Sequence, residues 1–261
     1  MSTGVKPPAV GPARKGPAKT RADLLVVERG LAESRARAQR LILAGQVWSG
    51  TQRIEKSGEL VRSDAPLEVR TGERFVSRGG DKLDAALESF RLDVRDATCA
   101  DVGASTGGFT DCLLQRGARR VFAIDVGRGQ LADKLRRDPR VVVLERVNAR
   151  YLERDTLGGE VDVVVVDASF IGIEKLLAGI TAVLRRGGTL VALVKPQFEA
   201  GRDEAARARG VIRDPAVRDA AIARAREAIV AVGFQVLGEV DSTLKGPKGN
   251  RERFVLARRS G

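Results

Sequence analysis

One stretch near the middle of the chain restricts the possible folds more than any other. DVGASTGGFTDCLLQRGARRVFAIDVG, residues 101–127, contains an acid that ends an apolar run, a glycine-rich turn, a helical segment, a second apolar run and another acid. A strand, a tight turn and a helix in this order begin a doubly wound α/β sheet, which binds adenosine-containing cofactors at the carboxyl ends of its strands. Hydride transfer from a nicotinamide and methyl transfer from S-adenosylmethionine (SAM) both start from this arrangement.

The rest of the C-terminal part repeats the alternation of strands and helices. Val-rich runs predict buried parallel strands at 98–104, 120–126, 140–145, 161–170 and 189–195. Helices are expected at 107–116, 173–184 and 215–232, and the last two apolar runs, 234–240 and 251–258, predict an antiparallel hairpin at the sheet edge. The fold class is therefore α/β, with a doubly wound Rossmann-like sheet of the SAM-dependent methyltransferase kind and a small N-terminal α+β domain.

The N-terminal third predicts a separate small module. Asp23 is expected to cap a first helix that Gly30 ends, and Ser34 to cap a second helix that Gly45 ends. Extended segments follow, so the unit contains two helices and a small sheet. The expected organisation is a disordered basic tail at 1–20, the module at 21–69, a linker at 70–83 and the α/β domain at 84–261, with its first helix at 84–90.

Charge and composition narrow the possible partners and chemistries. The formal net charge is +12 and the pI is near 10.4, which predicts either a polyanionic partner such as RNA or a basic surface without a function. Residues 1–83 carry more than half of that charge, so a nucleic acid would be expected to bind there. The chain has no histidine, which removes Ser-His-Asp triads and His-based zinc sites. The two cysteines are widely spaced, so we expect reduced thiols and no metal site. No apolar run has membrane-spanning length, so we expect no membrane contact and a cytoplasmic location. We also expect a monomer.

The glycine-rich turn distinguishes between the two cofactors. Its sequence from Gly103 to Gly108 is GASTGG, which departs from the Gly-x-Gly-x-x-Gly of dinucleotide folds. A carboxylate at Asp101 would repel a pyrophosphate but suits the amino and sulfonium cations of SAM. Asp125, at the end of the next strand, can accept hydrogen bonds from ribose hydroxyls. The pocket therefore favours SAM over NAD.

Four charged residues stand where strands or helices of the sheet should meet above the cofactor. Asp167 and Lys195 each end an apolar strand, Lys82 precedes the first helix of the domain, and Glu252 opens its last strand. Without histidine, lysine is the candidate group for activating an alcohol, because burial or a neighbouring cation can lower the pKa of a lysine. Any one of these charges could be only a solvated strand end, but together they predict a catalytic cluster.

The motifs SRGGDKL, DVGASTGGFT, DVGRGQL, VKPQFE and GNRERF together resemble the TlyA (hemolysin A) family over about residues 21–258. The segment SRARAQRLILAGQV resembles the RNA-binding module of a small-subunit ribosomal protein, although Ser49 replaces the asparagine usual before the turn glycine. The resemblance implies an FtsJ-like catalytic domain that methylates the ribose 2'-hydroxyl of cytidine in ribosomal RNA.

The same resemblance assigns residues to roles. Lys82, Asp167, Lys195 and Glu252 would form the catalytic tetrad, with Lys195 engaging the 2'-hydroxyl. Arg35, Arg37 and Arg40 would contact RNA, unless this helix face is simply solvated. The residues expected to bind SAM are Asp101, Gly103, Ser105, Thr106, Gly107, Gly108, Phe109, Asp125, Val126, Asn148 and Asp167.

Two other functions remain open at this level. A ribosome-assembly factor could bind RNA without chemistry, and the family's older name suggests a membrane-active hemolysin. The complete tetrad argues against the first. The lack of a bulky apolar face on the basic helix argues against the second.

Overall fold

The computed structural model describes residues 18–43, 45–50, 52–69, 74–201, 210–246 and 248–261. Contacts divide the chain into two compact units, Met1–Glu73 and Arg74–Gly261, and this division falls within the segment 70–83 that the sequence assigns to a linker. Residues 1–17 of the predicted basic tail lie outside the described residues. The last residues of that predicted tail belong instead to strand β1, Lys19–Arg21.

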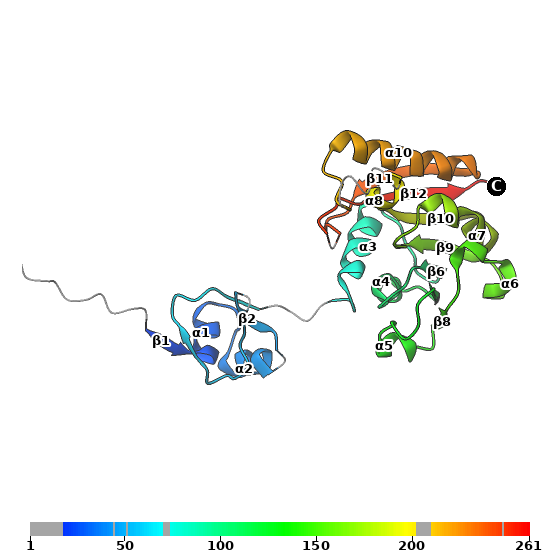
Figure 1. The fold of residues 1–261 in the computed structure, drawn as a ribbon. Coiled ribbons are helices and arrows are strands. Elements are labelled where there is room, and N and C mark those ends of the chain that lie inside the picture. Colours follow the sequence, from blue (N-terminus) through cyan, green and yellow to red (C-terminus); the bar gives the residue numbers. More distant parts are fainter. Residues whose placement is uncertain (1–17, 44, 51, 70–73, 202–209, 247) are drawn as a thin grey trace, which may run out of the picture. The chain divides into compact units, whose positions relative to one another are not determined.

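The first unit has two helices and two small antiparallel sheets (Figure 1). Its elements are β1, α1 (Ala22–Glu28), α2 (Arg35–Leu43), β2 (Val47–Ser49), β3 (Gln52–Arg53), β4 (Leu60–Arg62) and β5 (Leu67–Val69). β1 pairs with β4, and β2 pairs with both β3 and β5. Ser34 Oγ accepts a hydrogen bond from the Arg37 backbone N–H, and Gly45 has a φ of 70°, so the expected start and stop of α2 are confirmed.

The role predicted for Asp23 as a helix cap is wrong. Helix α1 begins one residue earlier, and Asp23 lies in its first turn with no exposed surface. The carboxylate accepts hydrogen bonds from Arg21, Arg35 and Gln39, each with a contact of 3.0 Å. The hydrogen bond from Arg21 is the main cause that lowers the pKa of Asp23. Side-chain donors from β1 and from the neighbouring helix α2 therefore hold this carboxylate, instead of the first-turn N–H groups of its own helix.

The second unit is built around a seven-stranded sheet in the order β11-β12-β10-β9-β6-β7-β8 (Figure 1). Its strands are β6 (Thr98–Val102), β7 (Arg120–Asp125), β8 (Val141–Glu145), β9 (Val161–Val166), β10 (Leu184–Val194), β11 (Phe234–Asp241) and β12 (Arg253–Arg259). The five strands from β6 to β10 are parallel, and β12 joins β10 and β11 in antiparallel pairs. The predicted doubly wound sheet and its terminal hairpin are confirmed.

Two apolar clusters cover the two faces of this sheet. Alternate residues of β9 separate between them, with Val164 and Val166 in one cluster and Val163 and Val165 in the other. The helical segments of this unit are α3 (Arg78–Ser89), α4 (Gly108–Gln115), α5 (Asp133–Arg136), η1 (Ala149–Tyr151), α6 (Arg154–Leu157), η2 (Ile173–Leu176), α7 (Leu177–Val183), α8 (Pro196–Glu199) and α10 (Pro215–Ala231). Residues of α7 and α10 pack on the first face, and residues of α3 and α4 pack on the second.

Helix α3 begins at Arg78, six residues before the helix start predicted at Asp84. Ser77 Oγ caps it by accepting from the Gly79 backbone N–H at 3.3 Å. The glycines in SRGGDKL were interpreted as a linker, but a Cβ at Gly80 would lie 2.2 Å from the buried ring of Phe75. The glycine therefore serves close packing and not flexibility, and Lys82 lies within the helix.

Three further features bear on function. Among the described residues, no helix combines the length and the apolar character that crossing a bilayer requires. Within those same residues, no cluster of three or more His, Cys, Asp or Glu side chains could bind a metal ion. Cys99 and Cys112 are free and buried, and burial raises the pKa of each thiol to about 12.

Candidate active site

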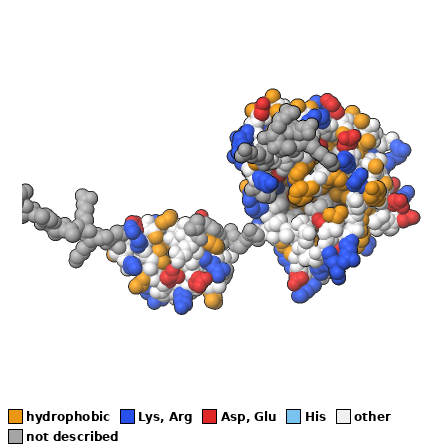
Figure 2. Space-filling model, viewed as in Figure 1, with side chains coloured by type: hydrophobic (Ala, Val, Ile, Leu, Met, Phe, Trp, Pro, Cys, Tyr) orange, Lys and Arg blue, Asp and Glu red, His pale blue; other side chains and the backbone are white. Residues whose placement is uncertain are grey.

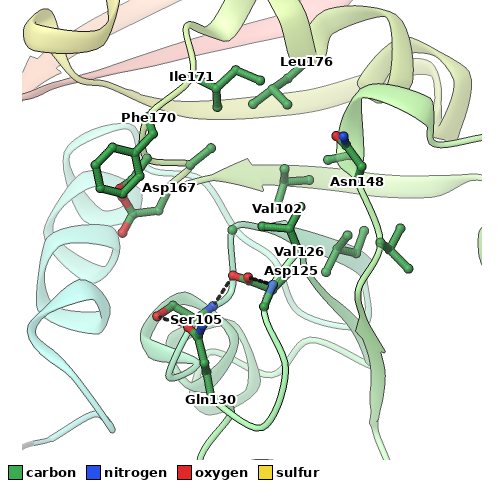
Figure 3. Close-up of a pocket in the computed structure, with 17 residues that line it drawn as sticks. Val102, Ser105, Asp125, Val126, Gln130, Asn148, Asp167, Phe170, Ile171 and Leu176 are labelled. Carbon is green, nitrogen blue, oxygen red and sulfur yellow. Dashed lines mark hydrogen bonds between the residues drawn. The ribbon is translucent and has the colours of Figure 1, made fainter.

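A pocket of about 460 Å³ opens where the chain order of the sheet reverses, between β6 and β9 (Figure 3). The carboxyl ends of β6, β7 and β9 supply Val102, Asp125 and Asp167, and the segment after β8 supplies Asn148. The other lining residues are Gly103, Ser105, Ile124, Val126, Gly127, Gln130, Val147, Ala149, Ala168, Ser169, Phe170, Ile171 and Leu176. The volume lies within the range typical of small-molecule sites.

The glycine-rich turn forms one wall of the pocket, and Asp125 holds it. The Asp125 carboxylate accepts from the Ser105 backbone N–H at 2.9 Å and from the Gly127 backbone N–H at 2.7 Å. Ser105 Oγ donates to Gln130 on the far side of the turn (Figure 3). Gly103 has a φ of 87°, and a Cβ there would lie 3.0 Å from the backbone of Ala168. The left-handed conformation at Gly103 and its close approach to the segment that follows β9 both require glycine.

Asp101 lies behind the turn and does not line the pocket, which differs from the sequence prediction. The side chain is fully buried, and one oxygen accepts from both the backbone N–H and the hydroxyl of Thr110, at 2.9 and 2.7 Å. Its other oxygen has no hydrogen-bond partner among the described residues. Burial raises the pKa of Asp101 to about 7, which the hydrogen bond from Thr110 opposes.

The other predicted cofactor residues fall into two groups. Gly103, Ser105, Asp125, Val126, Asn148 and Asp167 line the pocket, as expected. Thr106, Gly107, Gly108 and Phe109 do not line it. A Cβ at Gly107 would meet Leu135, a Cβ at Gly108 would meet Ser77, and Phe109 is buried against Phe254 with ring centroids 6.1 Å apart. These positions let helix α4 pack closely and so support the turn indirectly.

The pocket chemistry fits SAM better than a pyrophosphate cofactor. The lining includes two carboxylates, Asp125 and Asp167, and no lysine or arginine is among the described lining residues. Acidic groups attract the amino and sulfonium cations of SAM and would repel phosphate groups. Apolar side chains on the same pocket, from Val102, Ile124 and Val147, offer a surface for an adenine ring.

Lys195 follows β10 and is bound to the end of β9. Its Nζ lies 2.7 Å from Asp167 Oδ1 and donates to Ser169 Oγ at 2.9 Å and to the Asp167 carbonyl oxygen at 3.3 Å. The Lys195 residue is only 8% exposed. The parallel pairing of β9 with β10 thus brings together a lysine and an acid 28 residues apart.

Lys82 and Glu252 form the second buried pair. Nζ of Lys82 donates to Glu252 Oε2 at 2.5 Å, and the two side chains are 9% and 1% exposed. Lys195 directly follows β10 and Glu252 directly precedes β12, and the last register pair of these neighbouring strands is Val194 with Arg253. The four residues predicted to be catalytic therefore form two lysine–carboxylate pairs.

The predicted RNA-contacting arginines of α2 differ in their surroundings. Arg35 Nε lies 3.0 Å from the buried Asp23 carboxylate, so this arginine is held in an ion pair although its side chain is 53% exposed. Arg37 and Arg40 are exposed, and within the described residues no ion pair holds either of them. These two arginines remain available to a polyanion.

The sequence analysis missed several residues beside the pocket. Phe170 is 91% exposed, has a φ of 66° and lies next to Phe198 with ring centroids 5.4 Å apart. Arg150 lies over the ring of the exposed Tyr151, directly after the pocket residue Asn148. Figure 2 shows hydrophobic side chains gathered on the viewed face of the second unit, with lysines and arginines around them. In the sequence, Phe170 ends the apolar run 161–170, and nothing in that pattern indicated that its ring would be exposed.

A doubly wound sheet with an acidic pocket at its switch point and a separate small unit of two helices are typical of a methyltransferase-type domain joined to an RNA-binding type of unit. The FtsJ-like methyltransferase family model matches residues 75–259, and the S4 domain model matches residues 20–66. The chain belongs to the FtsJ-like methyltransferase family and carries an S4 domain at its N-terminal side.

Three similar proteins illustrate the relationship. YqxC of Bacillus subtilis, provisionally named an rRNA methyltransferase, is 46% identical, covering 91% of this chain and 85% of its own length. The 16S/23S rRNA (cytidine-2'-O)-methyltransferase TlyA of Mycobacterium tuberculosis is 44% identical, covering 92% of this chain and 90% of its own. A solved structure from Streptococcus thermophilus, provisionally called a hemolysin, is 40% identical with a TM-score of 0.71, covering 93% of this chain and 89% of that one.

Proposed function

We propose that this protein transfers a methyl group from SAM to the ribose 2'-hydroxyl of cytidine in ribosomal RNA. The observation that carries the proposal is the buried Lys195–Asp167 ion pair, because Asp167 also lines the pocket. The buried Lys82–Glu252 pair supplies a second lysine held by a carboxylate. The rRNA methyltransferase names of relatives that cover nearly the whole chain support the same substrate class.

The pocket residues would hold SAM in one orientation. Asp125 retains lone pairs for the ribose hydroxyls after accepting two backbone N–H groups. Asp167 lines the pocket and reaches Lys195, so it lies between the cofactor and the acceptor. When bound, SAM supplies an electrophilic methyl group on a sulfonium, and the protein's task is to place an oxygen in line with it.

Lys195 is the group that would engage the acceptor oxygen. Its Nζ is held by Asp167 and Ser169, and this fixes the direction of its remaining N–H bonds. Bound SAM would supply the methyl group and leave as a neutral thioether. The Lys195–Asp167 pair would hold the 2'-oxygen and take up the hydroxyl proton as one coupled unit.

Lys82 and Glu252 would complete the acceptor side of the site. The Glu252 carboxylate neutralises Lys82 in a nearly dry environment and fixes its position along helix α3. Lys82 can then bind the ribose or the adjacent phosphate oxygen, while Glu252 orients it. Positioning by these fixed charges supplies much of the expected rate acceleration.

RNA would be bound by parts of both units. The exposed Arg37 and Arg40 of α2 can contact phosphates, because each neutralised phosphate releases counterions. In the second unit, Arg150 and the exposed rings of Tyr151 and Phe170 offer charge and stacking surface near the pocket. No further assumption about how the two units are arranged is needed for this proposal.

The proposal can be tested by methyl transfer to ribosomal subunits. Purified protein is incubated with tritiated SAM and subunits that lack the modification, and the labelled nucleotide is identified by digestion and mass spectrometry. We expect label on the 2'-oxygen of cytidine. Lys195→Ala and Lys195→Arg should each lower the single-turnover rate by about 10²- to 10⁴-fold, because neither can position and accept the proton as lysine does.

The matched control is Lys175→Ala, which removes an exposed lysine of η2 and should leave the rate unchanged. SAM and RNA affinities of Lys195→Ala should stay close to those of the unaltered protein, since the residue acts on the reacting oxygen. Label on a base nitrogen, or an undiminished rate for Lys195→Ala, would overturn the mechanism. RNA binding without any methyl transfer would indicate an assembly factor instead.

A further inference from the structure

Glu199 ends the short helix α8, four residues after Lys195, and its carboxyl group points back to the neighbouring chain segment. Glu199 Oε1 accepts a hydrogen bond from the Ile173 backbone N–H at 2.9 Å. A Cβ on Gly172 would lie 3.0 Å from Glu199 Oε2 and 3.3 Å from the Phe198 carbonyl oxygen. Burial raises the pKa of Glu199, and the hydrogen bond from Ile173 opposes that shift. This acid is therefore committed to a contact inside the protein.

Two segments lie along each other at this place. The first is residues 167–173, which follows β9, and the second is residues 195–199, which follows β10. They are joined at one end by the Lys195–Asp167 ion pair, in the middle by the Phe170–Phe198 ring contact, and at the other end by the Glu199–Ile173 hydrogen bond. We call these three contacts the clamp.

The first of the two segments, residues 167–173, forms part of the pocket and also holds Lys195. Asp167, Ala168, Ser169, Phe170 and Ile171 form one wall of the pocket. Asp167 and Ser169 also supply the three acceptors that hold Nζ of Lys195. A shift of this segment would therefore displace the cofactor wall and the catalytic lysine together. Phe170 has a φ of 66°, an unfavourable conformation for a phenylalanine that surrounding contacts must maintain.

We propose that Glu199 is a positioning residue of the methyl-transfer reaction, which acts by anchoring the segment 167–173 and thereby holding Asp167 and Lys195 in their reactive arrangement. The inference rests on the proposed function of the same site. Glu199 itself touches neither cofactor nor acceptor in this role. Its carboxylate accepts the hydrogen bond of the Ile173 backbone N–H, which lies at the end of the segment that forms the pocket wall.

The test compares Glu199→Ala with Glu199→Gln. Glutamine keeps a carbonyl oxygen that can accept from Ile173, whereas alanine leaves this N–H without its partner. We expect Glu199→Ala to lower the single-turnover rate at saturating SAM by about 10- to 100-fold, because small misplacements of reacting groups carry costs of this size. The rate of Glu199→Gln should stay within about 3-fold of that of the unaltered protein. Glu174→Ala, which removes an exposed acid of the same charge from η2, is the matched control and should be neutral.

A double-mutant cycle separates positioning from general destabilisation. If Glu199 acts through Asp167, then Glu199→Ala should cost little further rate in an Asp167→Asn background, so the two effects are not additive. Full additivity, or a Glu199→Ala rate equal to that of the unaltered protein, would refute the proposal. Circular dichroism and thermal midpoints check that each variant is folded.

The binding of SAM alone distinguishes a failure of this inference from a failure of the proposed function. The segment 167–171 is a pocket wall, so Glu199→Ala should also weaken SAM binding by about 3- to 10-fold in calorimetry, with Glu199→Gln again near normal. If the protein methylated no RNA at all, this affinity pattern would still support the anchoring role. Unchanged SAM affinity together with an unchanged rate would contradict it.

Discussion

The buried Asp101 shows how a side chain can support the glycine-rich turn of a pocket without lining that pocket. One of its oxygens ties the start of helix α4 through Thr110, while the other remains unpartnered in the interior. The glycine-rich turn lies between this carboxyl and the pocket, because Gly103 follows it by two residues and lines the wall. Asp101 therefore shapes the turn from behind and contributes negative potential to the pocket when it is ionised.

The raised pKa of Asp101 predicts a pH dependence of stability. Burial raises this pKa from an ordinary 3.8 to about 7, so between these two pH values the folded protein binds a proton that the unfolded chain has released. Stability must then fall as pH rises through this window, by at most about 1.4 kcal/mol per pH unit, and level off above it. Asp101→Asn keeps an acceptor for Thr110 and should lack this slope.

The measurement is the free energy of unfolding in urea at several pH values from 5 to 8 for both proteins without SAM. At each pH, the free energy of unfolding of the variant is subtracted from that of the unaltered protein. The contributions of other titrating groups cancel in this difference. A difference that does not change with pH would show that Asp101 is ionised throughout this range in the folded state.

The glycine-rich turn is the element on which the pocket depends. Gly103 has a left-handed backbone conformation and lies against the backbone of Ala168, so a side chain there is doubly unfavourable. We expect Gly103→Val to weaken SAM binding by at least about 100-fold, because the turn and the β9 end must separate. Calorimetric titration with SAM gives the affinity.

Gly129→Val serves as the control for this substitution. Gly129 has a φ of 69°, yet nothing lies within 4 Å of a Cβ built there, so it tests backbone strain without a clash. A similar loss of SAM affinity in both variants would mean that strain alone, and not the contact with Ala168, explains the effect.

For the molecule as a whole, the proposed RNA contacts include the first unit, whereas the pocket lies in the second unit. Reversing Arg37 and Arg40 to glutamate in the full chain should weaken RNA binding and reduce its dependence on salt, since fewer counterions are released. SAM affinity should not change. Binding of rRNA fragments is measured at several salt concentrations, and an unaffected affinity at low salt would place the RNA contacts elsewhere.

Arg35 is left out of this substitution on purpose. Its contact with the buried Asp23 means that Arg35→Glu would bring two carboxylates together in the interior of the first unit. Loss of RNA binding in that variant would report unfolding of the unit, and a lower thermal midpoint would reveal it. The comparison therefore separates surface charge from internal structure.

The sheet could be predicted in detail because its signals are local. Apolar runs mark strands directly, so β6, β7 and β8 were found within two residues of their observed bounds, whereas β9 ends at Val166, four residues before the predicted end. The terminal hairpin and the long helix α10 have equally direct patterns. Among the predictions that were wrong, the start of α3 and the role of Asp23 share a cause, because a distant side chain changes the meaning of a local motif: Phe75 fills the space at Gly80, and α2 supplies donors to Asp23.

The amino-acid sequence was enough to predict the doubly wound fold, the acidic residues near the pocket and four charged residues as a candidate catalytic cluster, because residue type and strand order are written along the chain. The pairing of these charges, the complete burial of Asp101 and the hydrogen bond from Ile173 to Glu199 became visible only in the folded chain. Distance along the chain explains the difference: Lys82 and Glu252 are 170 residues apart, and such a contact depends on the register of strands and the packing of helices. No local pattern records that register.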